Sequence, residues 1–437
     1  MFKQVMPLSA IIAMRFFGLF IVLPVISAYA IAMNGATPFL VGIVLGGYAL
    51  TQVVFQVPFG IMSDKIGRKQ TILIGIVVFI LGSIICSVST DIYTLIFGRF
   101  LQGAGAIGAV ISAMISDLVK EEVRTKAMAM MGGSIALAFS AAMVAGPLVS
   151  ASFGVGALFD IAAFLAFVSL VILYTVVPNP PKIVHKYSED FNIGQILRDS
   201  KINKMNVTNF LQKGFMTMAF MLIPVALMKN FGWSFHDLVK VYAPSMVAGI
   251  FAMAPAAILA EKKGKFKQVL IAGIVFFMAS FLAMGFANSA TFFVVGVVLF
   301  FIGFNMHEPI MQSLASKYAK VHEKGTVLGI FNAYGYLGTF FGGVAGGLFF
   351  NSALHELALA IALICGFWIA LIATLPNPTK TKVAYFALAD INPNGHDILA
   401  DIEGVEEVYE NETEQTLVAK YHEDVVTLEE LKRSLAR

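Results

Sequence analysis

The sequence has little charge and almost no cysteine. Charged residues make up 13% of its 437 residues, whereas a soluble domain usually carries about 25%. The two cysteines, Cys86 and Cys365, both stand inside apolar runs, which excludes a disulfide framework and a cysteine-based metal cage. The sequence also lacks a nucleotide-binding loop and a recognisable nucleophile constellation. We therefore expect neither an enzyme nor a resident cofactor or metal, and no nucleic-acid partner.

Long apolar runs take the place of the missing charge. A helix needs about 20 apolar residues to cross roughly 30 Å of hydrocarbon. The first run is of full membrane length, so it predicts a span rather than a cleaved signal peptide. Twelve spans are expected, six in each half of the chain, over residues 7–33, 38–62, 71–90, 93–118, 126–152, 156–177, 204–228, 238–260, 267–287, 291–316, 325–350 and 355–375.

The loops between these spans alternate in charge. One set is short and almost free of cations, apart from Lys229 and Lys240. The other set is basic, at residues 65–69, 120–126, 182–204, 262–267 and 317–324. The positive-inside rule places basic loops in the cytoplasm. We therefore predict a multi-pass protein of the cell inner membrane with both termini in the cytoplasm.

Composition and span count divide the chain into four parts. Residues 1–177 form a first six-helix bundle, 178–203 a cytoplasmic linker and 204–376 a second bundle. Residues 381–437 are polar and predict a small cytosolic domain. The lipid bilayer is the expected surrounding, and we expect a monomer.

An internal repeat relates the two bundles. Pro58, Asp64, Gly67 and Arg68 recur at a constant offset as Pro255, Glu261, Gly264 and Lys265, and Ser116, Arg124 and Gly146 as Ser316, Lys324 and Gly346. A basic loop explains one such match by coincidence, but not several in the same order. Duplication predicts a pseudo-two-fold axis along the membrane normal, with a substrate cavity between the bundles.

Three short patterns point to one family. They are Gly60, Asp64, Gly67, Arg68 and Lys69 between spans 2 and 3; Arg99 to Gly103 in span 4 with Asp117 and Arg124 beyond it; and Gly133, Gly146 and Pro147 in span 5. They resemble motif A, the RxxQG motif and motif C of the major facilitator superfamily. Motif C is associated with antiporters, although Ala142, Ser150 and Ala151 stand where that pattern has glycines.

The resemblance covers residues 1–376 and implies a fold and an activity. The fold would be an all-α membrane protein of twelve helices in two pseudo-symmetric six-helix bundles. Residues 15–24, 60–69, 98–103 and 124–129, with the C-terminal domain, are most similar to the YajR-type branch. That branch implies a proton-driven exporter, which moves a small compound out of the cell in exchange for protons.

Motif A has a structural role in the family that these residues can fulfil. Gly60 would let span 2 approach the glycine-rich span 11 closely. Asp64 would then lie near the cytoplasmic N-terminus of span 11, where a helix dipole favours an anion. Arg68 would pair with Asp117. Together these contacts would latch the cytoplasmic side shut in an outward-open state; alternatively, a short basic loop only enforces topology.

Five ionisable residues fall at membrane depth, where such groups are functional candidates by default. They are Arg15, Arg99, Lys213, His307 and Glu308. Glu308 is the first choice for carrying a proton, because a buried carboxylate resists ionisation. The alternative is a structural ion pair of Glu308 with Arg15 or Lys213, and a pair that breaks during transport would couple proton to substrate. His307 points to another face, where packing alone would explain it.

Methionines gather in span 7 at Met216, Met218 and Met221. An apolar, adaptable cavity would suit an amphipathic substrate. Thioethers also suit Cu(I), but we rank this copper pathway well below the amphipathic substrate.

The C-terminal part changes abruptly to charged sequence. Strands are expected at 383–388, 405–409 and 416–421 and helices at 396–402 and 428–435, with Thr427 and Glu430 as a capping box. The order resembles a ferredoxin-like α+β domain, as in YajR-type proteins and heavy-metal-associated domains. The cysteine pair of the latter is absent. So small a core favours docking against the membrane part.

We thus expect a secondary active transporter that exports a small amphipathic or toxic compound in exchange for protons by alternating access. Proton-coupled uptake is one alternative. The other is a transporter-like membrane sensor that signals through the C-terminal domain.

Overall fold

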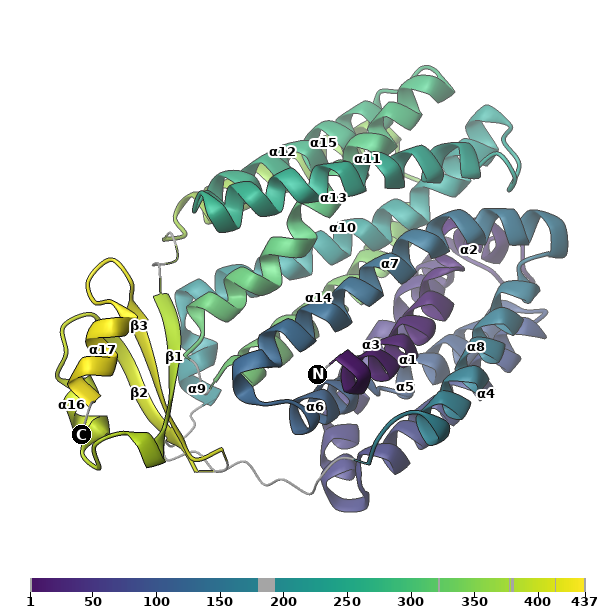
Figure 1. The fold of residues 1–437 in the computed structure, drawn as a ribbon. Coiled ribbons are helices and arrows are strands. Elements are labelled where there is room, and N and C mark those ends of the chain that lie inside the picture. Colours follow the sequence, from purple (N-terminus) through teal and green to yellow (C-terminus); the bar gives the residue numbers. More distant parts are fainter. Residues whose placement is uncertain are drawn as a thin grey trace.

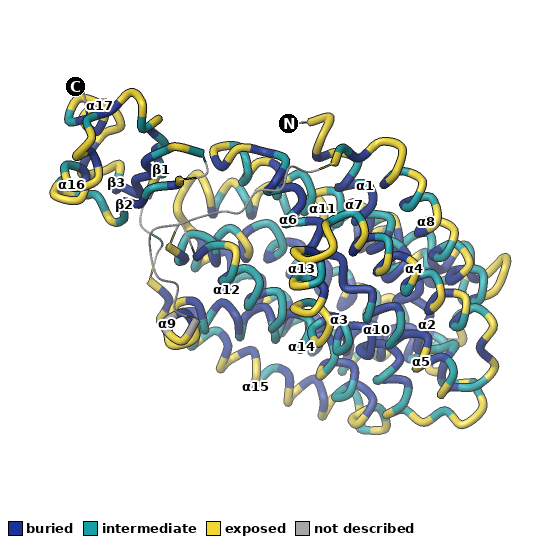
Figure 2. Tube along the Cα trace, turned by 90° about the horizontal axis from the view of Figure 1, so that it is seen from below, coloured by how far each residue is buried: buried dark blue, intermediate teal, exposed yellow. Residues whose placement is uncertain are grey.

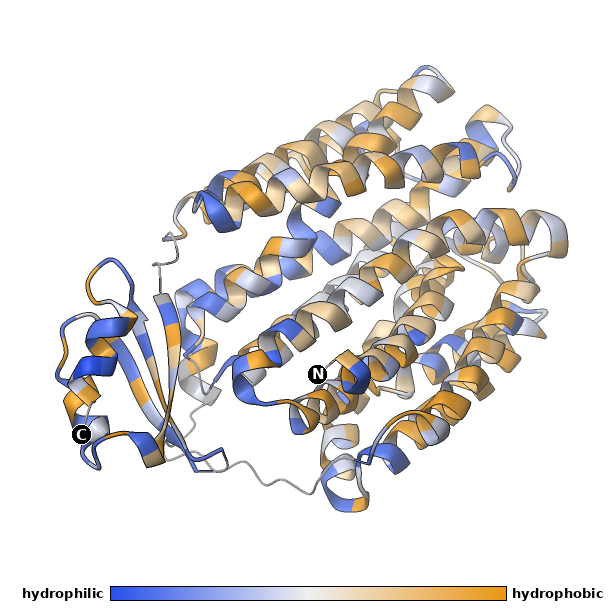
Figure 3. Ribbon diagram, in the orientation of Figure 1, coloured by the Kyte–Doolittle hydropathy of each residue, from blue (hydrophilic) through white to orange (hydrophobic). Residues whose placement is uncertain are grey.

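The structure is a computed structural model that describes residues 2–179, 193–320, 323–376, 378, 381–412 and 414–435. Within these residues, twelve helical segments are long and apolar enough to cross a membrane. The predicted spans are thereby confirmed, with boundaries that differ by a few residues. Hydrophobic residues cover most of these helices, whereas hydrophilic and hydrophobic residues are mixed in the small domain (Figure 3).

The first half consists of eight helices that make six spans. Two spans are broken in the middle: span 1 into two helices, of which the second starts with Pro24 in its first turn, and span 4 around Gly105. A proline is tolerated there because its missing N–H is an orphan at a helix start anyway. The helices are α1 (Phe2–Phe20), α2 (Leu23–Ala30), α3 (Pro38–Ile66), α4 (Arg68–Ser87), α5 (Ile92–Ala104), α6 (Gly108–Leu118), α7 (Glu121–Phe153) and α8 (Gly156–Thr175).

The second half repeats the pattern with longer uninterrupted helices. A short helix, α9 (Ile193–Arg198), precedes it. Its first span is buried along most of its length, as Figure 2 shows for α10. The helices are α10 (Ser200–Phe231), α11 (Val239–Ala257) continued by a π-helical turn (Ile258–Lys262), α12 (Phe266–Gly285), α13 (Ala290–Tyr318), α14 (Lys324–Leu348) and α15 (Leu354–Ala373).

Short connections with capping side chains define where many spans begin. The side chains of Thr37, Asp91 and Ser289 accept hydrogen bonds from backbone N–H groups in the first turn of α3, α5 and α13. Between α3 and α4 the turn is a single residue, Gly67. Its φ of +99° is one that a residue with a side chain rarely adopts, which explains the glycine.

Among the described residues, the helix backbones of the two halves touch on one side of the membrane part. We call the side that carries the start of α1, the Gly67 turn and the C-terminal domain the tail side, and the opposite one the far side (Figure 1). On the far side, Gly42 packs on the backbone of Gly343, and the hydroxyl of Ser27 donates to the carbonyl of Phe220 at 2.9 Å. Glycines allow this approach because two helix backbones can touch.

The C-terminal domain lies at the tail side, at one end of the molecule (Figure 1). Its antiparallel sheet has the order β1-β3-β2, as expected for a ferredoxin-like unit. In the capping box, the N–H of Glu430 donates to the hydroxyl of Thr427 at 3.3 Å. The predicted order is confirmed as β1 (Thr381–Ala387), a 3-10 turn (Leu388–Asp390), α16 (Gly395–Ala400), β2 (Val405–Asn411), β3 (Thr416–His422) and α17 (Leu428–Leu435).

Candidate functional site

Arg68 organises the turn between α3 and α4. Its guanidinium donates to Asp117 at 2.9 Å and to Asp64 at 2.6 Å, and it also contacts the hydroxyl of Ser63. Asp117, at the end of α6, is almost fully buried, with 6% of its side chain exposed, whereas Asp64 is 68% exposed. The expected pair of Arg68 and Asp117 is present. It ties the motif A turn to span 4 inside the first half.

The expected close approach at Gly60 is not found. A Cβ added there would meet no atom of a neighbouring helix within 4 Å. Spans 2 and 11 do pack together through glycines, but in their far-side portions, where Gly42, Gly46 and Gly347 contact the partner backbone. The physical reason is that the two helices touch in their far-side portions in this structure, so their tail-side portions are not pressed together.

Two further cations of the predicted latch have other partners. The ammonium of Lys69 donates to the carbonyl of Val177 at the end of span 6, at 2.6 Å. Arg124, in the first turn of α7, lies 3.5 Å from the carboxylate of Glu414 in the C-terminal domain. Neither contact joins the two bundles.

At membrane depth, Glu308 of α13 forms an ion pair with Lys213 of α10. The amide of Gln212 also donates to Glu308 at 3.2 Å. Both charged side chains are partly open, with 32% of Glu308 and 25% of Lys213 exposed. Of the two partners that sequence alone leaves open for Glu308, the structure selects Lys213 and not Arg15.

Aromatic rings from both halves pack together beside this pair. Phe139 of α7 packs against Phe304 of α13 with ring centroids 5.6 Å apart, and against Phe20 and Phe220 at 5.2 and 6.4 Å. The Lys213 ammonium lies over the ring of Phe304, 4.8 Å from its centroid. We call Phe20, Phe139, Phe220 and Phe304 the aromatic barrier. It joins the two halves, and the ion pair borders it.

The remaining predicted residues at depth lie elsewhere. His307 is fully buried; its Nε2 is 2.8 Å from the carbonyl of Leu270, and its ring packs on Phe277 and Trp368. It does not join the ion pair. Arg15 and Arg99 are buried in the first half, on α1 and α5.

The motif C residues lie along α7. A side chain on Gly146 would collide with the backbone carbonyl of Ile21, where α7 crosses span 1. Pro147 follows inside the same helix. At Gly133, by contrast, an added Cβ would meet no atom of a neighbouring helix within 4 Å. Gly146 therefore has a packing reason in this arrangement and Gly133 does not.

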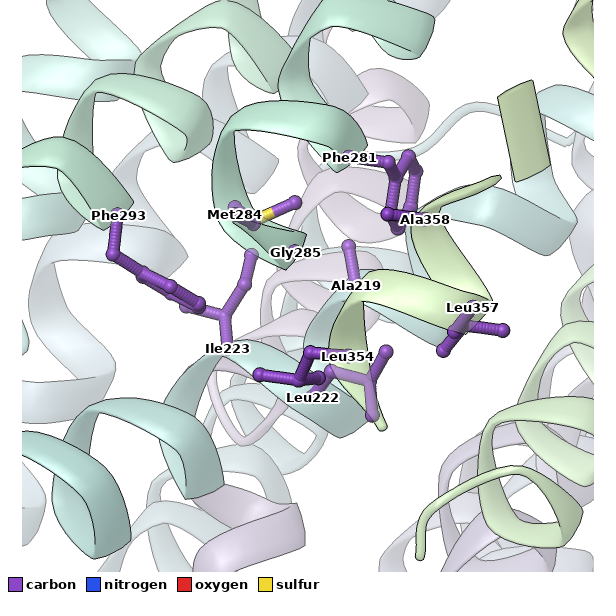
Figure 4. A pocket seen from close by; sticks show the side chains of 10 residues that line it. All are labelled: Ala219, Leu222, Ile223, Phe281, Met284, Gly285, Phe293, Leu354, Leu357 and Ala358. Atoms are coloured by element: carbon purple, nitrogen blue, oxygen red, sulfur yellow. The ribbon is translucent and has the colours of Figure 1, made fainter. Parts of the chain in front are cut away.

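The methionines of span 7 belong to the apolar core. Met216, Met218 and Met221 are buried among aliphatic and aromatic side chains. A small apolar pocket nearby is lined by ten residues of the second half (Figure 4): Ala219, Leu222, Ile223, Phe281, Met284, Gly285, Phe293, Leu354, Leu357 and Ala358. It has no charged lining and does not reach the first half, so it is not the space between the bundles.

The C-terminal domain docks on the first half through Glu121, the first residue of α7. Its carboxylate, which is buried, accepts from the hydroxyl of Tyr409 and from the amide of Asn411, the latter at 2.5 Å. In return, the carboxylate of Glu414 accepts from the N–H of Glu121 at 3.0 Å. An anion at a helix N-terminus is favourable. Burial, and then the charge of Glu121, raise the pKa of Tyr385 on β1.

The same domain also touches the second half. Lys420 of β3 donates to the carbonyl of Ala319 at 3.5 Å, and Lys324 interacts electrostatically with Glu407 of β2. Ala319 and Lys324 flank the turn between α13 and α14, which the repeat relates to the turn before α7. The sequence predicted that the domain docks but did not indicate these residues. The one feature that could have pointed to them is the internal repeat, which relates Arg124 to Lys324.

Known proteins similar to this chain match it over most of its length. A family model described as Major Facilitator Superfamily matches residues 8–343 and 208–387. The inner membrane transport protein YajR of Escherichia coli is 34% identical over 98% of this chain and 96% of its own. The class B tetracycline resistance protein of Escherichia coli is 25% identical over 68% of this chain and 76% of its own. The structure of a bacterial homologue of the human lysosomal transporter Spinster matches with a TM-score of 0.66 and 13% identity, over 85% of this chain and 97% of that one.

Proposed function

The chain belongs to the major facilitator superfamily, and we propose that it exports a small amphipathic compound in exchange for protons. The observation that carries the proposal is the ion pair of Lys213 and Glu308, a partly open carboxylate at membrane depth beside the aromatic barrier. Ionisable residues in this setting mark ion and proton pathways. The similarity to a tetracycline resistance protein supports export over uptake.

The orientation follows from the charges. The tail side carries the basic loops, so the positive-inside rule places it, with both termini, in the cytoplasm of a cell whose inner membrane holds the protein. In that orientation the far-side contacts and the aromatic barrier close the outer face. The arrangement described above is then inward-open, and Glu308 is accessible from the cytoplasm.

The ion pair offers a simple coupling step. Protonation of Glu308 would remove its charge and release Lys213, which would break a contact between α10 and α13. Binding of a proton from the outside and its release inside would then require the carboxylate to face each side in turn. Export of the compound would accompany the opposite half of that cycle.

Motif A would act in the other half of the cycle. When the tail side closes, Gly60 would allow α3 to approach α14, and Asp64, which is exposed here, would reach the start of α14. Arg68 would hold Asp64 and Asp117 in place meanwhile. This latch would stabilise the outward-open state.

The C-terminal domain is best explained as a modulator of this cycle. It touches repeat-related turns of both halves, through Glu121 and Ala319. A domain docked on both halves would favour the arrangement in which both contacts fit. This docking also keeps open the alternative of a sensor that reports through the domain.

Flux in sealed inside-out vesicles distinguishes these functions. An expressing strain is first screened for survival against diverse toxic amphipaths. A compound found in this way should accumulate inside vesicles that have an acidic interior. Protons should leave the vesicles as the compound enters. Proton-coupled uptake would instead move preloaded compound out of the vesicles together with the protons under the same gradient. A sensor would show no flux, and deletion of residues 380–437 would abolish its output rather than slow transport.

A further inference from the structure

Two arginines are buried together in the first half at membrane depth. Arg15 is 2% exposed and Arg99 is fully buried. Tyr48 lies between them: the Arg99 guanidinium is 4.6 Å from the centroid of its ring, and Tyr48 also interacts electrostatically with Arg15. The cluster therefore holds two positive charges away from water.

The polar partners of these arginines are neutral. Arg99 donates to the carbonyl of Val44 at 3.1 Å and to the amide oxygen of Gln102 at 2.7 Å. Arg15 donates to the amide oxygen of Gln52 at 3.2 Å. Its Nε and Nη1 have no hydrogen-bond partner among the residues that the structure describes. Arg15 is thus the less satisfied of the two.

No carboxylate of the described part of the first half is placed to balance this charge. The acidic residues within 2–179 all stand at or near helix ends: Asp64, Asp91, Asp117, Glu121, Glu122 and Asp160. In the second half, Glu308 is at membrane depth but is bound to Lys213 and Gln212. A buried charge without a charged partner is strongly unfavourable, so a counter-anion is expected.

The cluster lies where the two halves meet. The amide of Gln52, which holds Arg15, donates to the hydroxyl of Tyr336 on α14 of the second half at 2.9 Å. Apolar rings flank the guanidinium, with the centroids of Phe16 and Phe79 at 5.7 and 5.6 Å. Phe16 in turn stacks on Phe20 of the aromatic barrier. A ligand between the halves would meet one cation in an apolar aromatic setting.

We propose that Arg15 is the anion subsite for the transported compound, and that this compound is an amphipathic carboxylate. A guanidinium presents a planar fork of N–H donors that matches a carboxylate in two-point contact. The aromatic surroundings fit the apolar body of such a ligand, whereas they would not compensate a small hydrated anion. Gln52 and Tyr336 would shift on binding, because they hold the free guanidinium in its present position.

The inference rests on the proposed transport function but is tested by binding alone. The full-length protein is placed in phosphatidylcholine nanodiscs without a proton gradient, and calorimetry compares 1-naphthoate with the neutral 1-naphthamide. We expect the carboxylate to bind roughly tenfold or more tightly than the amide. Arg15→Gln should reduce this ratio to near one, and Arg15→Lys should retain part of it. The exposed Arg433→Gln variant is the control and should retain all of it.

Four outcomes would overturn the inference. They are equal binding of both probes by the unaltered protein, no binding of the naphthoate, a ratio that survives Arg15→Gln, and displacement of the naphthoate by equimolar inorganic phosphate. Glu308→Gln should leave the ratio unchanged; a ratio reduced as in Arg15→Gln would identify Glu308, in another state, as the counter-charge and would also overturn the inference. The proposed proton coupling fails separately, when proton flux is absent although the ratio is intact.

Discussion

At the scale of single residues, charge pairs at helix ends were easier to predict than pairs inside the membrane. When twelve spans are counted along the sequence, Arg68 and Asp117 both lie at span ends on the same side of the membrane. Their contact is therefore expected from the topology alone. Glu308 had two possible cationic partners at similar depth. The choice of Lys213 depends on how α10 and α13 are rotated toward each other, which positions in a sequence do not determine.

The first prediction concerns Arg68. Arg68→Met should lower the free energy of unfolding by about 2 kcal/mol or more, because the buried carboxylate of Asp117 loses its ion pair with Arg68. Asp64→Asn should change it little, since exposed ion pairs contribute little. The comparison is made by thermal unfolding in detergent, with the exposed neighbour Lys65→Met as the matched control. Equal melting temperatures for the Arg68 and Lys65 variants would contradict this role.

At the scale of elements, the spans and the small domain were predictable because hydropathy and strand patterns are local. The contact between spans 2 and 11 was predicted between the right helices but at the wrong end. The glycines that touch are at the far side, such as Gly42 and Gly343. One sequence serves both states of a transporter, so it could not indicate which end is closed in the state described.

The second prediction uses two glycines of the same helix. Gly42→Val should open the far side, because its side chain would collide with the backbone of Gly343. Gly60→Val should leave the present arrangement intact, because a Cβ at this position has open space around it, and should hinder closure of the tail side. Spin labels at the exposed residues Lys65 and Lys262 report the tail-side distance between the halves.

For the labels at these two sites, Gly42→Val should shift the population toward shorter distances and Gly60→Val toward longer ones. If both substitutions shifted the distance in the same direction, the assignment of the far-side contact and of the motif A approach to opposite states would be wrong.

At the scale of the whole molecule, the C-terminal domain connects the two halves. Its sheet offers Tyr409 and Asn411 to Glu121, and Lys420 to Ala319. Docking was predictable from the small core. The face of the domain that docks was not predictable, because nothing in the sequence distinguishes the docking residues from other strand residues.

The third prediction follows from this docking. The double variant Tyr409→Phe, Asn411→Leu should release the domain, because it leaves the buried carboxylate of Glu121 without these donors. Spin labels at the exposed residues Lys126 and Glu429 should then show a broad distance distribution in place of a narrow one. Glu423→Gln, which removes an exposed pair within the domain, serves as the control. An unchanged narrow distribution in the double variant would exclude Glu121 as the anchor.

In the proposed cycle Glu308 carries the coupled proton, and one measurement tests this role most directly. Inside-out vesicles are loaded with a pH-sensitive dye and acidified, and an exported compound from the survival screen is added. Unaltered protein and the variant Glu356→Gln, an exposed carboxylate at the far side, should discharge the pH gradient, and Glu308→Gln should not. Discharge by Glu308→Gln at the rate of the unaltered protein would contradict the account.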